Sequence, residues 1–423
     1  MYRGLALTLL SIAVAARGVA AQHAWVVSPQ FGPGVDFTTI QAAVNAAADG
    51  DTILVNLGAY VGNVAIANKR LVILGLPGPV GSQPAITGTL WIGGLQTDRS
   101  VVLRHLQFIP LPSDTASVLI TNCDGPVLVE DCPMVNFSSS ATAAPRVAYS
   151  SHVVFTRCSF TAPHAHNGFV PGVGLAGLEL VNSDVTLYSC TITGSTGVGG
   201  KVSPGGAETP AEVGGPGLRV SGGTVLLAGG EIHGGTGGWG DTDIAQPGAC
   251  VPGASGGPGV VLDGGLVRRL DDGLVGGKAG FDASCGTGSP GEELQLISGS
   301  IEIVPVAPLR TLQITSPAVA GESAQISLHG QPGELAFLLQ SLTPLGAWSG
   351  ALKGTLAGAE PYAIFVLGPL GPDGALVATI SLPDPLLPSG TETLLLIEQF
   401  ATVASSGKSL STPSAVTLLA EQP

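Results

Sequence analysis

Three stretches of this chain repeat one pattern without gaps, at 177–194, 217–234 and 259–276. They read GLELVNSDVTLYSCTITG, GLRVSGGTVLLAGGEIHG and GVVLDGGLVRRLDDGLVG. Each consists of short alternating strands separated by tight turns, and the pattern returns after tens of residues. Such a period is typical of a solenoid, in which every repeat stacks on its neighbours. The repeat therefore predicts the architecture more firmly than any single motif does.

Aligning the repeats predicts interior columns of apolar residues. One column contains Leu106, Cys132, Cys158 and Cys190 at equivalent positions of successive repeats. A strand, a turn and a second strand in each coil, hydrogen-bonded to the coils on either side, is what a β-helix requires. We therefore expect these three cysteines to be small buried apolar residues rather than disulfide partners. Cys123 has no obvious partner.

Inserts rich in glycine and proline follow the repeats at equivalent corners, at 195–216, 235–258 and 277–293. We expect these inserts to stack into a lobe along one edge of the solenoid. Solenoid inserts commonly form a binding face, and the alternative is a solvated flap without a ligand. Cys250 and Cys285 lie one repeat apart in these inserts, and we predict a disulfide between them.

The beginning of the chain has the features of a secretory signal. Arg3 precedes an apolar run, and small residues precede a cleavage point before Gln22. We predict a signal peptide at 1–21 and an exported protein without a membrane span, because glycine and proline interrupt every later apolar run. The net charge of −14 argues against nucleic acid as a partner, since phosphate binding needs clustered lysines and arginines.

The run DFTTIQAAVNAAADGDTILV predicts a short helix before the first strands. Thr38 and Gln41 have the spacing of a capping box, and Gly50 is placed to end the helix. Ile40 and Val44 would lie on one apolar face. We expect this helix to cover the open end of the first coil, which would otherwise expose unpaired strand edges.

The residues from Asp36 to Leu76 resemble the N-terminal cap and first coils of the pectin lyase-like superfamily, and Leu57 replaces a proline that is usual there. The resemblance implies a right-handed parallel β-helix of the bacterial secreted type, extending over 22–305. From residue 306 the pattern changes to short strands with glycine and proline turns. This change predicts a C-terminal β-sandwich accessory domain at 306–423 and an all-β protein.

The enzymes of this superfamily act on acidic polysaccharides, but none of their catalytic motifs is complete here. Hydrolases of the class need paired carboxylates, and lyases need Ca²⁺-binding aspartates with an arginine base. Arg268, Asp271 and Asp272 are the candidate catalytic residues for a divergent polysaccharide lyase or glycoside hydrolase. The alternative is a shifted strand or a structural ion pair, because Arg269 and Asp272 fall in interior columns and would have to pair if they point inward.

Candidate ligand-binding residues lie on outward positions and in the second insert. Glu231 and His233 share one outward face, and Trp239 stands beside Asp241 and Asp243. An aromatic platform next to carboxylates suits a sugar, with Ca²⁺ as a weaker candidate. No Cys-x-x-Cys pattern occurs, so no zinc or redox site is predicted. Apart from this Ca²⁺ candidate, the sequence predicts no metal or other cofactor.

These observations favour an exported, non-catalytic β-helix protein. Its stacked loops would bind surface or extracellular polysaccharide, or a partner in the cell envelope. The divergent enzyme and a purely structural surface protein remain as alternatives. The sequence predicts no oligomeric state.

Overall fold

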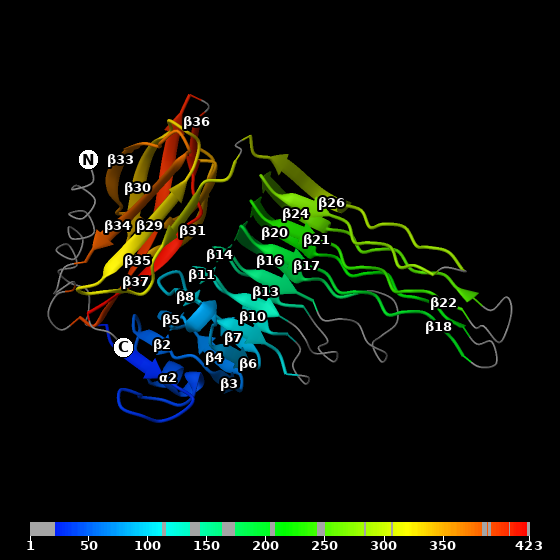
Figure 1. Ribbon diagram of the computed structural model, residues 1–423, viewed down its shortest axis with the longest axis horizontal. Coiled ribbons are helices and arrows are strands. Elements are labelled where there is room, and N and C mark those ends of the chain that lie inside the picture. Colours follow the sequence, from blue (N-terminus) through cyan, green and yellow to red (C-terminus); the bar gives the residue numbers. More distant parts are fainter. Residues whose placement is uncertain are drawn as a thin grey trace.

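A computed structural model shows a long parallel solenoid with a β-sandwich packed along one of its sides (Figure 1). The described part of the chain has no helix long and apolar enough to cross a membrane. The predicted signal peptide lies outside the described residues. The structure describes residues 22–423 except 112–115, 136–143, 163–173, 204–207, 243–249, 283–284, 306–307, 383–386, 388–390, 406 and 421–423.

Each coil of the solenoid has three sides, which we name A, B and C in chain order. Sides A and B belong to a 14-stranded sheet, and side C is a separate 8-stranded sheet. Side A contains β4 (Val64–Ala67), β7 (Leu90–Gly93), β10 (Val118–Thr121) and β13 (Arg146–Ala148). Side B contains β1 (Ala24–Val27), β2 (Thr52–Val55), β5 (Leu71–Gly75), β8 (Val101–Arg104), β11 (Val127–Glu130) and β14 (Val153–Thr156). Side C contains β3 (Ala59–Val61), β6 (Ala85–Thr87), β9 (Gln107–Ile109), β12 (Pro133–Val135), β15 (Ser159–Thr161), β17 (Thr191–Thr193), β21 (Glu231–His233) and β25 (Gly273–Val275).

Further along the chain, sides A and B merge into long strands that bend at a corner. The bend uses residues with positive φ: Asn182 (44°), Gly222 (83°), Gly264 (89°) and Gly299 (103°). Asparagine and glycine tolerate this left-handed region better than other residues. The repeat pattern predicted two strands in each coil. Because the first of them bends at this corner, each coil has three sides. The long strands are β16 (Leu178–Tyr188), β20 (Leu218–Ala228), β24 (Val260–Leu270) and β26 (Leu294–Ile303).

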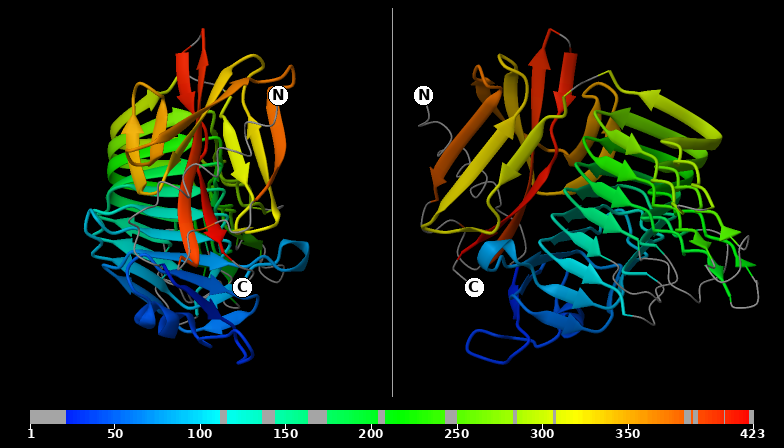
Figure 2. Two further views of the ribbon diagram at one scale, coloured as in Figure 1. Left: turned by 90° about the vertical axis from the view of Figure 1, so that its left-hand side faces the viewer. Right: turned by 45° about the vertical axis from the view of Figure 1, so that its right-hand side comes forward.

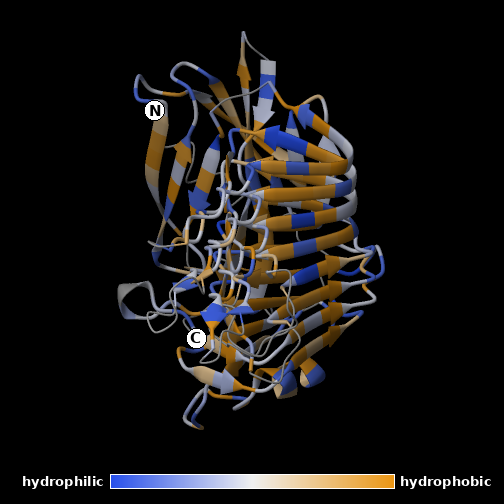
Figure 3. Ribbon diagram, turned by 90° about the vertical axis from the view of Figure 1, so that its right-hand side faces the viewer, coloured by the Kyte–Doolittle hydropathy of each residue, from blue (hydrophilic) through white to orange (hydrophobic). Residues whose placement is uncertain are grey.

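The predicted interior columns are confirmed. Parallel pairing places Phe155 beside Leu187, and Phe160 beside Ile192. The thiols of Cys132, Cys158 and Cys190 are buried and free, as is that of Cys123. Hydrophobic segments lie side by side on neighbouring strands of the stack (Figure 3).

The helix α2 (Ile40–Ala46) packs on the first coils, and its buried residues include Ile40, Ala43 and Val44. A short 3-10 helix, η1 (Pro79–Gly81), lies in the connection after β5. The helix α2 therefore covers the N-terminal end of the solenoid core, where an open coil would otherwise be exposed to water.

The predicted ends of this helix were wrong by a few residues. Thr39, not Thr38, is the N-cap, and its hydroxyl accepts from a first-turn amide. Gln41 forms no capping box, because its side-chain oxygen accepts from the Ala65 amide of β4 at 2.6 Å. The helix stops at Ala46, before Gly50, because the next residue is already extended.

The C-terminal domain is a β-sandwich of two facing sheets around a core that includes Leu328 and Phe400. The sheets are antiparallel except where Ala318–Val319 pairs parallel with the last strand. The solenoid strands end at Ile303, and the first sandwich strand begins at Thr311. One sheet contains β27 (Thr311–Ile314), β29 (Ser323–His329) and β34 (Ala375–Ser381). The other contains β28 (Ala318–Val319), β30 (Leu335–Ser341), β33 (Ala363–Pro369), β35 (Thr393–Ala404), β36 (Gly407–Leu410) and β37 (Ser414–Leu419), and a hairpin is formed by β31 (Pro344–Ser349) and β32 (Gly354–Gly358).

The sandwich covers the outer face of side B (Figure 2). Outward residues of successive coils, such as Val102, Leu128 and Val154, form one apolar cluster with Ile397 and Ala415 of the sandwich. Side B is thus buried on both faces, which explains why its strands are apolar at consecutive positions rather than at alternate ones.

Glu398 of β35 predicts a pH-dependent stability of the sandwich. Its side chain is fully buried, and burial raises its pKa from 4.5 to about 8, although a hydrogen bond from Gln340 opposes the shift. The folded state therefore holds a proton that the unfolded state has lost. The contribution of Glu398 to stability should be greatest below about pH 4.5 and should fall as the pH rises to about 8, by a few kcal/mol at about 1.4 kcal/mol per pKa unit.

Urea unfolding of the protein and of Glu398→Gln at pH 5, 7 and 9 measures this effect. The neutral glutamine should remove the decline, so the difference in unfolding free energy between the two proteins should change with pH. A difference that stays constant from pH 5 to 9 would show that Glu398 does not hold the proton.

Candidate functional site

The residues proposed as catalytic from the sequence lie near one another in the last full coil but point to different places. Asp272 points into the coil, with 4% of its side chain exposed, and pairs with Arg269 at 3.0 Å. Burial raises the pKa of Asp272 even though Arg269 opposes the shift. The geometry therefore matches the alternative of an inward structural ion pair.

Asp271 and Arg268 face outward and have structural partners. The Asp271 carboxylate accepts from the Leu309 amide at 2.9 Å and so holds the segment that leads to the sandwich. The Arg268 Nε atom donates to Glu302 at 2.8 Å, and its guanidinium lies 4.7 Å from the centroid of the Trp348 ring. The two aspartates do not share an open groove, which paired carboxylates in glycoside hydrolysis require.

The three inserts stack into a lobe that projects from the solenoid where side C leads to side A (Figures 1 and 2). From Gly194 into the first insert, every third amide donates to the next repeat and its insert. Gly194, Gly197 and Gly200 donate in turn to the carbonyls of His233, Thr236 and Trp239, at 3.0, 2.8 and 2.8 Å. A period of three is that of the polyproline II conformation rather than of a β-strand.

The same spacing continues into the third insert and makes the lobe a bundle of extended chains. Gly234 donates to the Val275 carbonyl of β25, and Gly237 and Gly240 donate to the third insert. The returning half of each insert adds bonds in another direction, for example from the Gly235 amide to the Gly215 carbonyl at 2.7 Å. The chains lie so close that a Cβ at Gly235 would overlap the backbone of Ser195. Glycine is therefore a packing requirement of this lobe.

The tip of the lobe is joined by short hairpins and one covalent bond. The structure joins Cys250 and Cys285 in a disulfide between the second and third inserts. The hairpins are β18 (Lys201–Val202) with β19 (Glu208–Thr209) and β22 (Asp241–Thr242) with β23 (Cys250–Val251).

Two acidic residues of the tip, Asp241 and Asp282, accept hydrogen bonds from the protein itself. Asp241 accepts from the Val202 amide at 2.9 Å, and Asp282 accepts from the Thr242 hydroxyl at 3.0 Å and from the Cys285 amide at 2.7 Å. Ca²⁺ takes roughly six to eight oxygen ligands, and these two carboxylates already serve protein donors. Asp243 lies outside the described residues.

An exposed aromatic pair lies on the lobe. Trp239 is 63% exposed and Phe281, one repeat later, is 50% exposed. Their ring centroids are 6.5 Å apart in an edge-to-face arrangement. Trp239 was a candidate from the sequence, whereas Phe281 was missed. The shared spacing from Gly234 to Trp239 and from Gly276 to Phe281 is the signal that places the two rings in one column.

Glu231 and His233 lie on β21 of side C. The His233 Nε2 atom is 3.2 Å from Glu231, with 35% and 71% of the two side chains exposed. This is a surface pair of the kind that contributes little to stability. It lies on the strand that leads into the second insert, before Trp239.

A buried polar cluster between the two domains was missed from the sequence. Arg104 and Glu130 occupy the same outward column of side B, and 6% and 5% of their side chains are exposed. Arg104 donates to the carbonyls of Ile314 and Ala415. Glu130 accepts from the Ser414 hydroxyl at 3.1 Å and the Ala415 amide at 2.7 Å. The signal was a charge ending each of two otherwise apolar runs, VVLR and VLVE.

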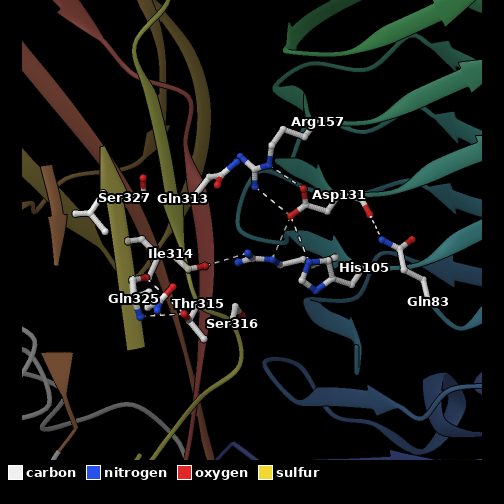
Figure 4. Close-up of a pocket in the computed structure, with 12 residues that line it drawn as sticks. Gln83, His105, Asp131, Arg157, Gln313, Ile314, Thr315, Ser316, Gln325 and Ser327 are labelled. Carbon is white, nitrogen blue, oxygen red and sulfur yellow. Dashed lines mark hydrogen bonds and ion pairs between the residues drawn. The ribbon is translucent and has the colours of Figure 1, made fainter. Parts of the chain in front are cut away.

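The corner between sides B and C adds three charged or polar residues, whose directions are shown in Figure 4. His105, Asp131 and Arg157 all have positive φ, at 54°, 54° and 52°. Asp131 accepts from Arg157 Nε at 2.7 Å and lies 3.4 Å from His105 Nε2. Burial alone would raise the pKa of Asp131, but His105 and the arginines more than offset it and hold that pKa well below its usual range.

A cavity of about 450 Å³ lies between this corner and sandwich residues that include Gln313 and Gln325. The two positive charges of Arg104 and Arg157 are balanced by the negative charges of Glu130 and Asp131. No excess charge therefore remains to attract an ionic ligand. The cluster is best explained as the contact that holds the sandwich on the solenoid. The lobe, with its exposed aromatic pair, is the stronger candidate for binding.

No protein-family model and no curated protein matches this chain. Among solved structures, it is similar to the enzymatically active domain of tailspike protein 4 of bacteriophage CBA120, with 10% identity and a TM-score of 0.26, over 89% of this chain and 65% of that one. The chain thus spans less than two thirds of that domain. It is also similar to the tailspike protein of Acinetobacter phage vB_ApiP_P1, with 10% identity and a TM-score of 0.19, over 86% of this chain and 73% of that one. The fold assignment rests on the strand pairing of this chain itself.

Proposed function

We propose that this chain is an exported polysaccharide-binding protein, without catalytic activity, whose glycine-rich lobe carries the binding surface. The observation that carries the proposal is the exposed pair of Trp239 and Phe281 on a rigid support. Aromatic rings pack against the apolar faces of sugar rings, and large exposed aromatics on a monomeric protein often mark a binding site. The ladder of glycine hydrogen bonds and the disulfide fix the positions of the rings before binding, which lowers the entropy cost of association.

The contacts of the last coil favour binding over catalysis. Asp272 is paired inside the coil, and Asp271 is held by the Leu309 amide. Neither carboxylate is placed to act as a general acid or base on a substrate in a groove. A purely structural surface protein would use no sugar ligand, and a binding experiment separates the two proposals.

Replacing Trp239 by alanine should weaken polysaccharide binding by about tenfold or more. The polysaccharide is first identified by screening the purified protein on a glycan array, and its affinity is then measured by calorimetry. An aromatic contact of this kind contributes on the order of 1–2 kcal/mol, and about 1.4 kcal/mol is tenfold in affinity.

Two variants serve as controls for this experiment. Trp239→Phe keeps a ring and should retain most of the affinity. Phe31→Ala removes a ring that is 75% exposed near the N-terminal end of the solenoid and should bind like the parent protein. Binding that survives Trp239→Ala and Phe281→Ala together would exclude the lobe as the binding surface, and an array without any ligand would favour the structural role.

A further inference from the structure

The C-terminal end of the solenoid is an incomplete coil. β26 continues sides A and B above β24, but among the described residues no strand of side C follows it. Leu296 pairs with Leu262, and Ile303 pairs with Arg269, so both continue interior columns. They are nevertheless 53% and 65% exposed, because no further coil covers them. β26 is seen at the upper edge of the solenoid in Figure 1.

The outer edge of this strand has no neighbour among the described residues. β26 pairs with β24 and with no other strand in the described sheet. A long exposed edge strand with apolar residues is a template for pairing with another chain. The opposite end of the solenoid differs, because α2 packs on the first coils there.

We propose that β26 pairs antiparallel with β26 of a second copy and forms a two-fold dimer. The sequence of the strand, LQLISGSIEI, bends at Ser298 and Gly299 into two arms of equal length. A two-fold axis through this bend exchanges the two arms and reverses the chain direction, while the interior side stays interior.

This axis matches apolar residues with apolar residues. It places Leu294 opposite Ile303 of the partner subunit, and Leu296 opposite Ile301 of the partner subunit. All four continue interior columns or pack against the core, so the apolar interior runs on from one copy to the other. Such cross-strand apolar pairs stabilise a sheet, whereas like charges directly opposite each other destabilise it.

The polar residues of the strand are compatible with the same register. Gln295 comes to lie opposite Glu302 of the partner subunit, so the charged residue of β26 faces an amide rather than a like charge. Because the other end of the solenoid is covered by α2, the contact closes after two copies and does not lead to a filament.

Sedimentation velocity over a range of protein concentrations tests the dimer. The protein should form a dimer, and Leu296→Lys should weaken dimerisation at least tenfold, because it puts a charge into an apolar column. Val366→Lys is the control, since Val366 is 70% exposed on β33 of the sandwich and should leave dimerisation unchanged. A protein that stays monomeric at all concentrations, or that dimerises equally well with Leu296→Lys, would overturn the proposal.

A pair of substitutions at Gln295 tests the register. Gln295→Lys should tighten the dimer several-fold, because it faces Glu302 of the partner subunit twice in the assembly. Gln295→Glu should weaken the dimer by a similar factor. Circular dichroism spectra verify that each variant is folded. Equal effects of the two substitutions would overturn this register and with it the two-fold arrangement.

Discussion

Glu130→Ala is expected to lower the free energy of unfolding by about 3 kcal/mol or more and to loosen the sandwich from the solenoid. Removing one partner of a buried ion pair costs roughly 3–5 kcal/mol, because the other charge stays buried without compensation. Here two arginines, Arg104 and Arg157, would be left with Asp131 as their one carboxylate partner among the described residues, and only 6% and 18% of their side chains are exposed. The substitution also removes the acceptor of the Ser414 hydroxyl and the Ala415 amide, both in the sandwich.

Urea unfolding gives the loss in stability, and limited proteolysis near residues 304–310 reports whether the domains separate. Glu302→Ala is the matched control. Glu302 pairs with Arg268 on the same side of the solenoid, but its side chain is 49% exposed. An exposed pair contributes about 0–1 kcal/mol, so this variant should unfold close to the parent protein. If both alanine variants lose the same small amount, the interdomain cluster does not hold the sandwich in place.

The solenoid could be predicted from the sequence because every coil needs apolar residues at the same interior positions. A residue in an interior column, such as Cys158, has an equivalent neighbour above and below, so one correct alignment places it and its whole column. The register of the strands confirms that alignment. The lobe followed from the same logic, since inserts at equivalent corners must leave the solenoid side by side.

The contact between the domains could not be predicted in the same way. It joins residues far apart in the chain, for example Arg104 and Ala415, and no repeat relates the sandwich to the solenoid. The sequence did contain a local indication. Side B is apolar at outward as well as inward positions, which in a parallel sheet means that a second layer covers it. Only the inward positions of these strands were aligned as apolar columns.

The internal order of the lobe was also present in the sequence. Glycine recurs at every third position in Gly194, Gly197 and Gly200, and again in Gly234, Gly237 and Gly240. Composition alone left a solvated flap as the alternative to a stacked lobe, whereas this spacing is the one that polyproline II chains need when they pack side by side. Phe281 was missed because its position beside Trp239 depends on the register between the second and third inserts.

Gly235→Ala is expected to disrupt the lobe, whereas Gly199→Ala is expected to be tolerated. Both glycines lie in the lobe with negative φ, so neither substitution is strained by its own backbone conformation. The difference lies in the surroundings. A methyl group at Gly235 would overlap the carbonyl group of Ser195, which is backbone and cannot turn away. At Gly199 the nearest atom to the new methyl would be the Trp239 carbonyl oxygen at 3.4 Å, an ordinary contact.

Overpacking of this kind typically costs about 1–3 kcal/mol, and at Gly235 the neighbouring chains must separate to relieve it. Polysaccharide affinity should therefore fall at least as far in Gly235→Ala as in Trp239→Ala, although residue 235 presents no side chain to a ligand. Protease cleavage within 195–258 should accelerate in Gly235→Ala and stay slow in Gly199→Ala. If Gly235→Ala resists the protease and binds like the parent protein, close glycine packing does not hold the lobe together. The proposed binding surface would then have no rigid support from that packing.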